Sequence, residues 1–164
     1  SSLKHELQVL SGLAWGIDAC AHRSALEWDI ETLAILPCSI DKIYPRQNAN
    51  LYQEIREKGL LLSQFAPGLK IRNWFFGLRN QVIAALCDVL IVIEAPEKSG
   101  ALITARAALE MGKDVYIVPG SYLSKRNLGA HQLVNEGAFL LAKIDDILET
   151  GLEKLKKPCK TRVL

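Results

Sequence analysis

The run Val89–Ile93 (V-L-I-V-I) constrains the fold more than any other stretch of this chain. It contains no polar residue and is rich in β-branched side chains, which predicts a strand buried on both faces. Such strands are typical of parallel sheets that helices cover on both sides. The run is also far shorter than the roughly 18 apolar residues of a membrane helix, so we expect no membrane association.

Other apolar runs alternate with helix-like segments on either side of this strand. We expect further strands at Gln8–Ser11, Thr32–Leu36, Leu60–Ser63, Val115–Val118 and Ala138–Leu141. We expect helices at Asp18–Trp28, Leu51–Lys58, Arg79–Leu86, Leu102–Met111 (closed by Gly112), Leu128–Glu136 and Ile144–Leu148. Strands that alternate with helices form right-handed βαβ units, so the sequence predicts an α/β fold with a mainly parallel sheet.

The composition fits one globular domain, since 49% of the 164 residues are hydrophobic and 23% are charged. We expect this domain to occupy residues 1–150 and residues 151–164 to form a basic linker or tail. Five cations against Glu153 give that tail a net charge of +4, which leaves −2 for the rest of a chain whose total is +2. Any polyanion site in the domain must therefore be local.

The start of the chain carries no secretory signal and no initiator methionine. Strand-like sequence begins within the first ten residues. We therefore expect the chain to be an N-terminally truncated piece of a longer protein.

Catalytic and metal chemistry have little support in the sequence. The four cysteines (Cys20, Cys38, Cys87 and Cys159) form no C-x-x-C pair, so we expect reduced, buried thiols and neither a zinc site nor a disulfide framework. There is no G-x-S-x-G motif, and none of the three histidines lies in a catalytic context. We interpret His22 as structural and expect no catalytic residue, no metal and no cofactor.

The segment Glu97–Thr104 follows the buried strand and opens a helix. Free N–H groups and the helix dipole attract phosphate at such a position. Lys98 adds charge, Ser99 can cap or donate, and Gly100 lets the backbone approach closely. The hydroxyl of Thr104 could reach the same anion from the first turn. A capped helix start without a ligand explains these residues equally well.

The segment Ser11–Asp18 also follows a strand and contains Gly12 and Gly16. Its amides could approach an anion, although it matches neither G-x-G-x-x-G nor a Walker A motif. We interpret Asp18 as the N-cap of the following helix and not as a catalytic acid.

No Asp or Glu occurs from Lys58 through Cys87, and within this window Lys70–Asn80 interleaves cations with aromatic residues. Single-stranded nucleic acid needs this combination of charge along its backbone and ring faces for unstacked bases. The alternative is that Trp74, Phe75 and Phe76 belong to the core. Three adjacent rings cannot all face one way, so we expect at least one to point outward.

Taken in order, these segments resemble the DNA-processing protein A family (DprA, also called Smf). The matching stretches are S-G-L-A-W-G-I-D-A-C-A-H-R at 11–23, I-Y-P-R-Q-N at 43–48, G-L-L-L-S-Q-F-A-P-G at 59–68, F-G-L-R-N-Q-V-I-A-A-L at 76–86, S-G-A-L-I-T-A at 99–105 and V-P-G at 118–120. The resemblance implies a Rossmann-like three-layer domain that binds single-stranded DNA and loads the RecA recombinase during natural transformation. It also implies a homodimer in the bacterial cytoplasm.

The chain departs from the family pattern at a few positions. A glycine-serine-arginine loop that contacts phosphate in the family would lie before Ser1. Gly77 and Gln81 depart from the usual Phe-Pro-x-Arg-Asn-Arg, so one expected cation is missing. Trp15 stands where an arginine is common.

The sequence thus predicts a non-catalytic, sequence-independent binder of single-stranded DNA. Phosphate would be held by Gly12 and its neighbouring amides and by Lys98, Ser99, Gly100 and Thr104. Arg79 would add charge, Asn80 would hydrogen-bond and Phe76 would stack a base.

Two alternatives remain open. The first is a Rossmann-like nucleotide phosphoribohydrolase, although the P-G-G-x-G-T-x-x-E loop of those enzymes does not occur here. The second is a scaffold for dimerisation and RecA contact.

Overall fold

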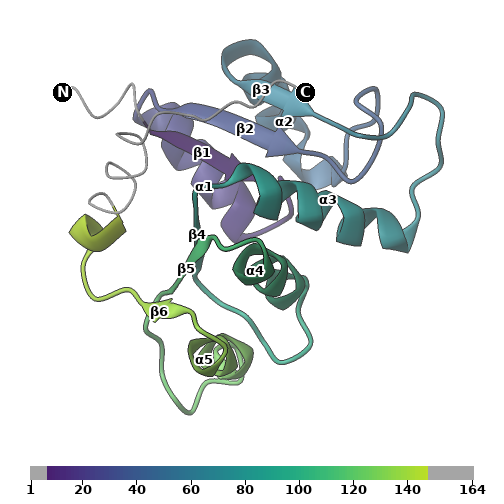
Figure 1. Cartoon of the computed structure of the whole chain (residues 1–164). Helices are drawn as coiled ribbons and strands as arrows, with labels where there is room; N and C mark the ends of the chain where they lie inside the picture. The colour runs from purple at the N-terminus through teal and green to yellow at the C-terminus, as the bar shows by residue number, and fades with distance from the viewer. Residues whose placement is uncertain (1–6, 148–164) are drawn as a thin grey trace, which may run out of the picture. The chain divides into compact units, whose positions relative to one another are not determined.

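A computed structural model describes residues 7–147 of the chain (Figure 1). The chain divides into two compact units at Leu86, and each is described by itself. We call residues 7–86 the first unit and residues 87–147 the second unit. The predicted tail 151–164, Leu148 and Cys159 lie outside the described residues.

The first unit contains a three-stranded parallel sheet in the order β1-β2-β3. Its elements are β1 (Gln8–Ser11), α1 (Ile17–Glu27), β2 (Glu31–Ile35), a 3₁₀ turn (Arg46–Asn48), α2 (Ala49–Lys58), β3 (Leu60–Leu62) and α3 (Asn73–Leu86). In the ladder, Leu33 of β2 lies opposite Leu10 of β1 and Leu60 of β3. Parallel ladders need crossover connections, which α1 and α2 provide.

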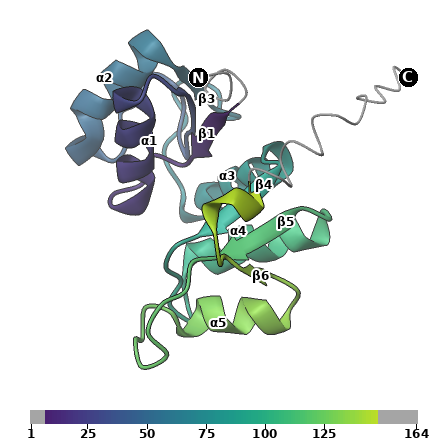
Figure 2. The ribbon, with the colours of Figure 1, turned by 90° about the vertical axis from the view of Figure 1, so that its left-hand side faces the viewer.

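Helices cover both faces of this sheet. Successive side chains of β2 point to opposite faces, so the residues that each side chain contacts show what covers each face. Ala34 and Leu36 belong to a buried cluster with Leu51 of α2, whereas Leu33 and Ile83 of α3 belong to a second cluster. Figures 1 and 2 show α1 and α2 on one face of the strands and α3 on the other. The first unit therefore confirms the predicted α/β class and its three layers.

The second unit repeats the parallel pairing with the order β4-β5-β6. Its elements are β4 (Val89–Val92), α4 (Gly100–Glu110), β5 (Asp114–Ile117), α5 (Leu128–Asn135) and β6 (Phe139–Leu140), and residues 144–147 are helical. α4 packs against β4, β5 and α5. As predicted, Gly112 ends α4; its positive φ of 69° is a conformation that glycine adopts without strain.

The prediction that Val89–Ile93 is buried on both faces is wrong. Val92 is buried, but Ile91 is 42% exposed and Ile93 is also exposed. β4 is an edge strand of its three-stranded sheet, and Ile91 and Ile93, two residues apart, share a face. The apolar composition of this run predicted a strand correctly. The burial of the strand depends on its position at the edge of the sheet, which composition does not show.

The start of α3 also differs from the prediction. The helix begins at Asn73, six residues before Arg79, so the aromatic segment is helical. Aromatic residues and Gly77 have low helix propensity, which obscured this first turn. Packing overrides propensity here, because the ring of Phe75 stacks on that of Phe65 at 4.0 Å.

Two smaller predictions need correction. Gly16 is the N-cap of α1, and Asp18 lies inside the first turn. Cys20 is exposed, whereas Cys38 and Cys87 are buried as expected. Within residues 7–147, no helix is long and apolar enough to cross a membrane.

Candidate nucleic-acid interface

Arg79 of α3 ties together the carboxyl ends of β1 and β2. The residue is only 6% exposed, and its Nη1 donates to the carbonyls of Gly12 and of Ile35, the latter at 3.1 Å. Its Nε donates to Oδ1 of Asn80 at 3.0 Å. Burial lowers the pKa of this guanidinium, an effect that the charge of Asp18 opposes. Arg79 is therefore a buried cation beneath two loops and not a side chain extended into solvent.

Gly12 is required by this arrangement. A Cβ atom built at Gly12 would lie 1.7 Å from Nη1 of Arg79, so any side chain there would collide with the guanidinium. Gly12 is buried, and its carbonyl is turned toward Arg79. The predicted contact of its neighbouring amides with phosphate stays a prediction.

The rest of the β1–α1 loop is held by side-chain hydrogen bonds to its backbone. Leu13 has a φ of 57°, a left-handed conformation that is strained for a leucine. Nδ2 of Asn48 donates to the carbonyl oxygens of Leu13 and Ala14 at 3.0 and 3.2 Å. The N–H of Ala14 donates to the carboxylate of Asp18 at 3.1 Å. Asn48 was missed by sequence reasoning, although it closes the motif at 43–48.

A hollow of about 190 Å³ opens beside this loop. Its lining residues are Gly12, Ala14, Trp15, Pro37, Tyr44, Pro45, Phe76 and Arg79, and none of them is acidic. Trp15 is 79% exposed, and Phe76 is half-buried. The rings of Tyr44 and Phe76 lie edge to face with centroids 5.6 Å apart. Three of the predicted site residues, Gly12, Phe76 and Arg79, thus line one hollow together with Trp15 and Tyr44.

The three adjacent aromatic residues face different ways. Trp74 is 63% exposed, which confirms that at least one ring points outward. Phe75 is 4% exposed and belongs to the core, whereas Phe76 borders the hollow.

In the second unit, the start of α4 carries the other predicted site residues. Ser99 is the N-cap, but its hydroxyl makes no capping bond and no described group bonds to this buried oxygen. Lys98 and Gly100 are exposed. The expected contribution of Thr104 needs correction, because this residue is buried and its hydroxyl donates to the carbonyl of Gly100 at 3.3 Å. Because this hydrogen bond runs to the preceding turn, the hydroxyl points toward the helix backbone and not toward a ligand.

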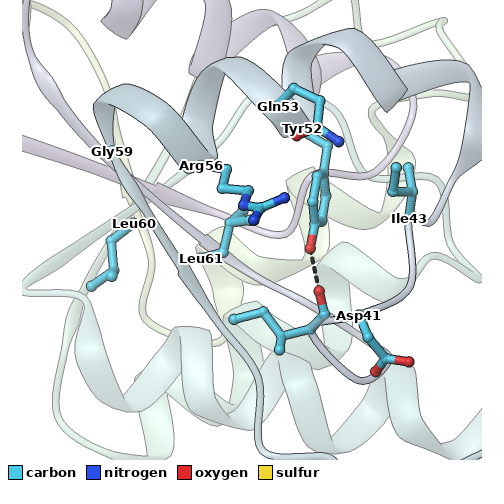
Figure 3. Close-up of a pocket in the computed structure, with 9 residues that line it drawn as sticks. Asp41, Ile43, Tyr52, Gln53, Arg56, Gly59, Leu60 and Leu61 are labelled. Atoms are coloured by element: carbon cyan, nitrogen blue, oxygen red, sulfur yellow. Dashed lines mark hydrogen bonds between the residues drawn. The ribbon is translucent and has the colours of Figure 1, made fainter. Parts of the chain in front are cut away.

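A second hollow in the first unit, of about 550 Å³, lies between α2, β3 and the segment after β2 (Figure 3). Arg56 and Asp41 line it with opposite charges, and the Tyr52 hydroxyl donates to the carbonyl of Ile40 at its side. None of the predicted site residues lines this hollow.

His22 is fully buried between α1 and β2, which confirms its structural interpretation. The Thr32 hydroxyl donates to the carbonyl of Val9 at 3.1 Å and therefore accepts from Nδ1 of His22, 2.7 Å away. Burial lowers the pKa of His22 to about 4, although Asp18 acts in the opposite direction. Among residues 7–147, no group of three His, Cys, Asp or Glu side chains could hold a metal ion.

Comparison with known proteins places these features in a family. The family model for DNA recombination-mediator protein A matches residues 1–151. DNA processing protein DprA of Streptococcus pneumoniae is 42% identical over 146 residues, which are 89% of this chain and 52% of that protein. Protein Smf of Escherichia coli is 37% identical over 142 residues, 86% of this chain and 38% of that protein.

Solved structures agree with these matches. DNA processing protein A of Streptococcus pneumoniae superposes with a TM-score of 0.82 at 40% identity, covering 90% of this chain and 52% of that one. The Helicobacter pylori protein, whose structure was described for its unique single-stranded DNA binding mode, gives 0.79 at 33% identity, covering 88% and 66%. The chain spans about half or less of the length of these curated relatives. With most of its residues matched in sequence and in fold, this chain belongs to the DNA recombination-mediator protein A family.

Proposed function

We propose that this chain binds single-stranded DNA without sequence preference. The observation that carries the proposal is the hollow at the carboxyl ends of β1 and β2, which combines three aromatic rings with a buried cation and no lining carboxylate. Ligands of parallel α/β sheets bind at this edge of the strands. Unstacked bases need ring faces, whereas the bases of a duplex are already stacked on one another.

The predicted site residues take different parts in this proposal. Phe76 offers a ring face at the hollow, and Arg79 adds positive potential from beneath it while Asn80 holds the guanidinium. In the second unit, Lys98 and the exposed start of α4 would attract a phosphate. Thr104 bonds to the carbonyl of Gly100 in the first turn of that helix and is assigned no contact with the phosphate.

Family membership supports a wider proposal for the protein to which this chain corresponds. It would act in the bacterial cytoplasm as a homodimer that loads RecA onto single-stranded DNA, without catalysing a reaction. Residues 1–150 would supply the Rossmann-like DNA-binding domain, and residues 151–164 a basic linker. In the second unit, Phe139, Leu140 and Ile144 are exposed apolar side chains that a protein partner would cover.

A titration with three ligands tests the proposal. Labelled oligo-dT should bind more tightly than a duplex of the same length, and its affinity should fall as salt rises because phosphate contacts release counterions. AMP should not be turned over. Equal affinity for oligo-dT and duplex would contradict single-strand binding. Steady release of base from AMP, lost on Ser99→Ala, would favour the nucleotide hydrolase.

A further inference from the structure

We infer that the free edge of β3 and the 550 Å³ hollow beside it dock an extended segment of a partner protein. The segment adds a strand to β3 and places one large apolar side chain in the hollow, with acidic residues on either side of it. The inference does not depend on DNA binding, because none of the residues that line this hollow lines the hollow of 190 Å³.

β3 is the last strand of the β1-β2-β3 sheet, and no described strand lies on its other side. The carbonyl of Leu62 accepts from the N–H of Leu36, so Leu62 directs its backbone groups toward β2. Neighbouring residues of a strand direct these groups to opposite sides, so Leu61 directs its N–H and its C=O to the free edge. Such unpaired groups can pair with a strand from another chain.

The side chains of β3 also favour a partner. The strand reads Leu-Leu-Leu and carries no charge that would keep another strand away. Leu60 is 56% exposed and Leu62 is 39% exposed, and both lie on the face opposite to the side chain of Leu61. Large apolar side chains that flank a free edge are typical of an interaction surface, so we expect a partner to cover them.

The hollow lies on the face of the sheet against which α2 packs (Figure 3). Leu61 and Tyr52 belong to one buried cluster, and with Ile43 they give the hollow an apolar wall. The Tyr52 hydroxyl donates to the carbonyl of Ile40, so it keeps a partner when an apolar group covers it. Directly opposite residues of paired strands point to the same face, so the partner residue opposite Leu61 points to the hollow. A volume of about 550 Å³ has room for a large side chain.

The charges around the hollow favour acidic neighbours for that side chain. Arg56 lines the hollow, is exposed, and makes no ion pair among the described residues. Lys58, the last residue of α2, is also exposed, and no acid follows it until after Cys87. The carboxylate of Asp41 lines the hollow too, but the adjacent Lys42 offsets its charge. A carboxylate two residues from the central side chain shares its face and can pair with Arg56.

A capped, labelled peptide with the sequence Glu-Val-Leu-Val-Glu tests the inference. Its leucine would enter the hollow, its valines would lie over Leu60 and Leu62, and its glutamates would flank the hollow. The sequence reads the same in both directions, so the result does not depend on whether the added strand is parallel or antiparallel. The peptide should bind the chain saturably, and hydrogen exchange of the Leu61 amide should slow.

A methylated peptide separates strand pairing from general apolar contact. Methyl groups on the backbone nitrogens of its leucine and of the following valine remove the donors that either strand direction would use. This peptide should bind at least roughly 5-fold more weakly and should leave the exchange of the Leu61 amide unchanged.

Variants of the chain test the edge and the cation. Leu60→Lys should weaken binding at least roughly 10-fold, because it places a charge on the edge, and should melt close to the parent because Leu60 is exposed. Arg56→Gln should weaken binding roughly 1.5- to 5-fold, and should have no effect on a peptide with glutamine in place of both glutamates. Arg46→Gln is the matched control, since Arg46 is an exposed cation of the same unit that does not line the hollow. It should leave both affinities unchanged.

Several results would overturn the inference. These are no saturable binding at millimolar peptide, equal binding of the methylated peptide, or unchanged exchange of the Leu61 amide in the complex. A dimer of the chain that Leu60→Lys dissociates would assign the edge to a second copy instead. Saturating oligo-dT should leave the affinity for the peptide unchanged; competition between them would make the hollow part of the DNA surface and the docking site wrong.

Discussion

The two loops that the sequence marks as anion sites are built in opposite ways. The loop after β1 has three of its backbone carbonyls and one N–H bonded to the side chains of Arg79, Asn48 and Asp18. The loop after β4 ends in Lys98, which is exposed, and Ser99, whose hydroxyl makes no capping bond. Similar sequence signals, a strand followed by glycine and a helix, therefore give one rigid loop and one with exposed charge.

This difference suggests two roles: the loop after β1 positions the side chains of the hollow, and the loop after β4 offers a charge that can contact DNA directly. Substitutions beneath the rigid loop should change the stability of the first unit and, through it, the shape of the aromatic hollow. Substitutions at the start of α4 should change the response to salt and leave stability alone. The predictions below test this contrast, from the largest expected effect to the smallest.

Arg79→Ala should have the largest effect on stability. It leaves the carbonyls of Gly12 and Ile35 without the buried donor that Arg79 provides. Each unsatisfied buried group costs about 1–3 kcal/mol, so the free energy of unfolding should fall by about 2–6 kcal/mol in urea denaturation. Arg79→Lys keeps the charge but lacks the planar fork, so most of the loss should persist. A parent-like midpoint for either variant would show that the guanidinium does not hold the loops.

Acid should weaken the first unit through His22. The folded chain keeps this ring neutral with its pKa lowered to about 4, whereas the unfolded chain takes up a proton near 6.5. Stability is therefore intact at pH 7 and falls as the pH drops from about 6.5 toward 4, by about 3 kcal/mol in all. Hydrogen exchange should accelerate in β1 and β2 more than in β4 and β5, since no histidine is fully buried among the described residues of the second unit. Equal acceleration in both sheets would contradict this assignment.

Phe76→Ala and Phe75→Ala should separate the hollow from the core. Phe75 is buried against Phe65, so its truncation should cost about 3–5 kcal/mol of stability. Phe76 is half-buried, so its truncation should cost less stability but weaken oligo-dT binding by about 1–3 kcal/mol with the salt slope nearly unchanged. Melting curves and titrations on both variants check this. If Phe76→Ala melts far lower while the folded fraction binds normally, its stacking role is wrong.

Much of the fold could be predicted because its signals are local. Short apolar runs such as Val115–Val118 favour a strand whichever strand they pair with. A glycine that follows an amphipathic helix marks the end of that helix. The burial of β4 could not be predicted in this way, since it depends on which strand lies at an edge. The first turn of α3 was missed because the packing of Phe75 on Phe65, and not propensity, stabilises it.

The candidate site was predictable in its location and less so in its geometry. The rule that ligands lie at the carboxyl ends of parallel strands led to Gly12. Nothing local showed that Arg79 is buried, because its partner Gly12 lies 67 residues earlier in the chain. The available sign was that Arg79 is the only charged residue of α3. In the sequence Trp15 stands out only as a departure from the family pattern, although its exposed ring lines the hollow.

Lys98→Ala should have the smallest effect on stability and a specific effect on salt dependence. Lys98 is exposed and precedes the N-cap of α4, so its removal should leave the melting temperature within error of the parent. If Lys98 contacts a phosphate, the slope of log affinity against log salt should decrease in magnitude by up to about 1. Lys113→Ala is the control, since Lys113 follows the opposite end of the same helix and should leave the slope unchanged. Equal changes in slope for the two variants would mean that α4 contributes only general charge. The loop after β4 would then have no direct contact with phosphate, and its contrast with the loop after β1 would be wrong.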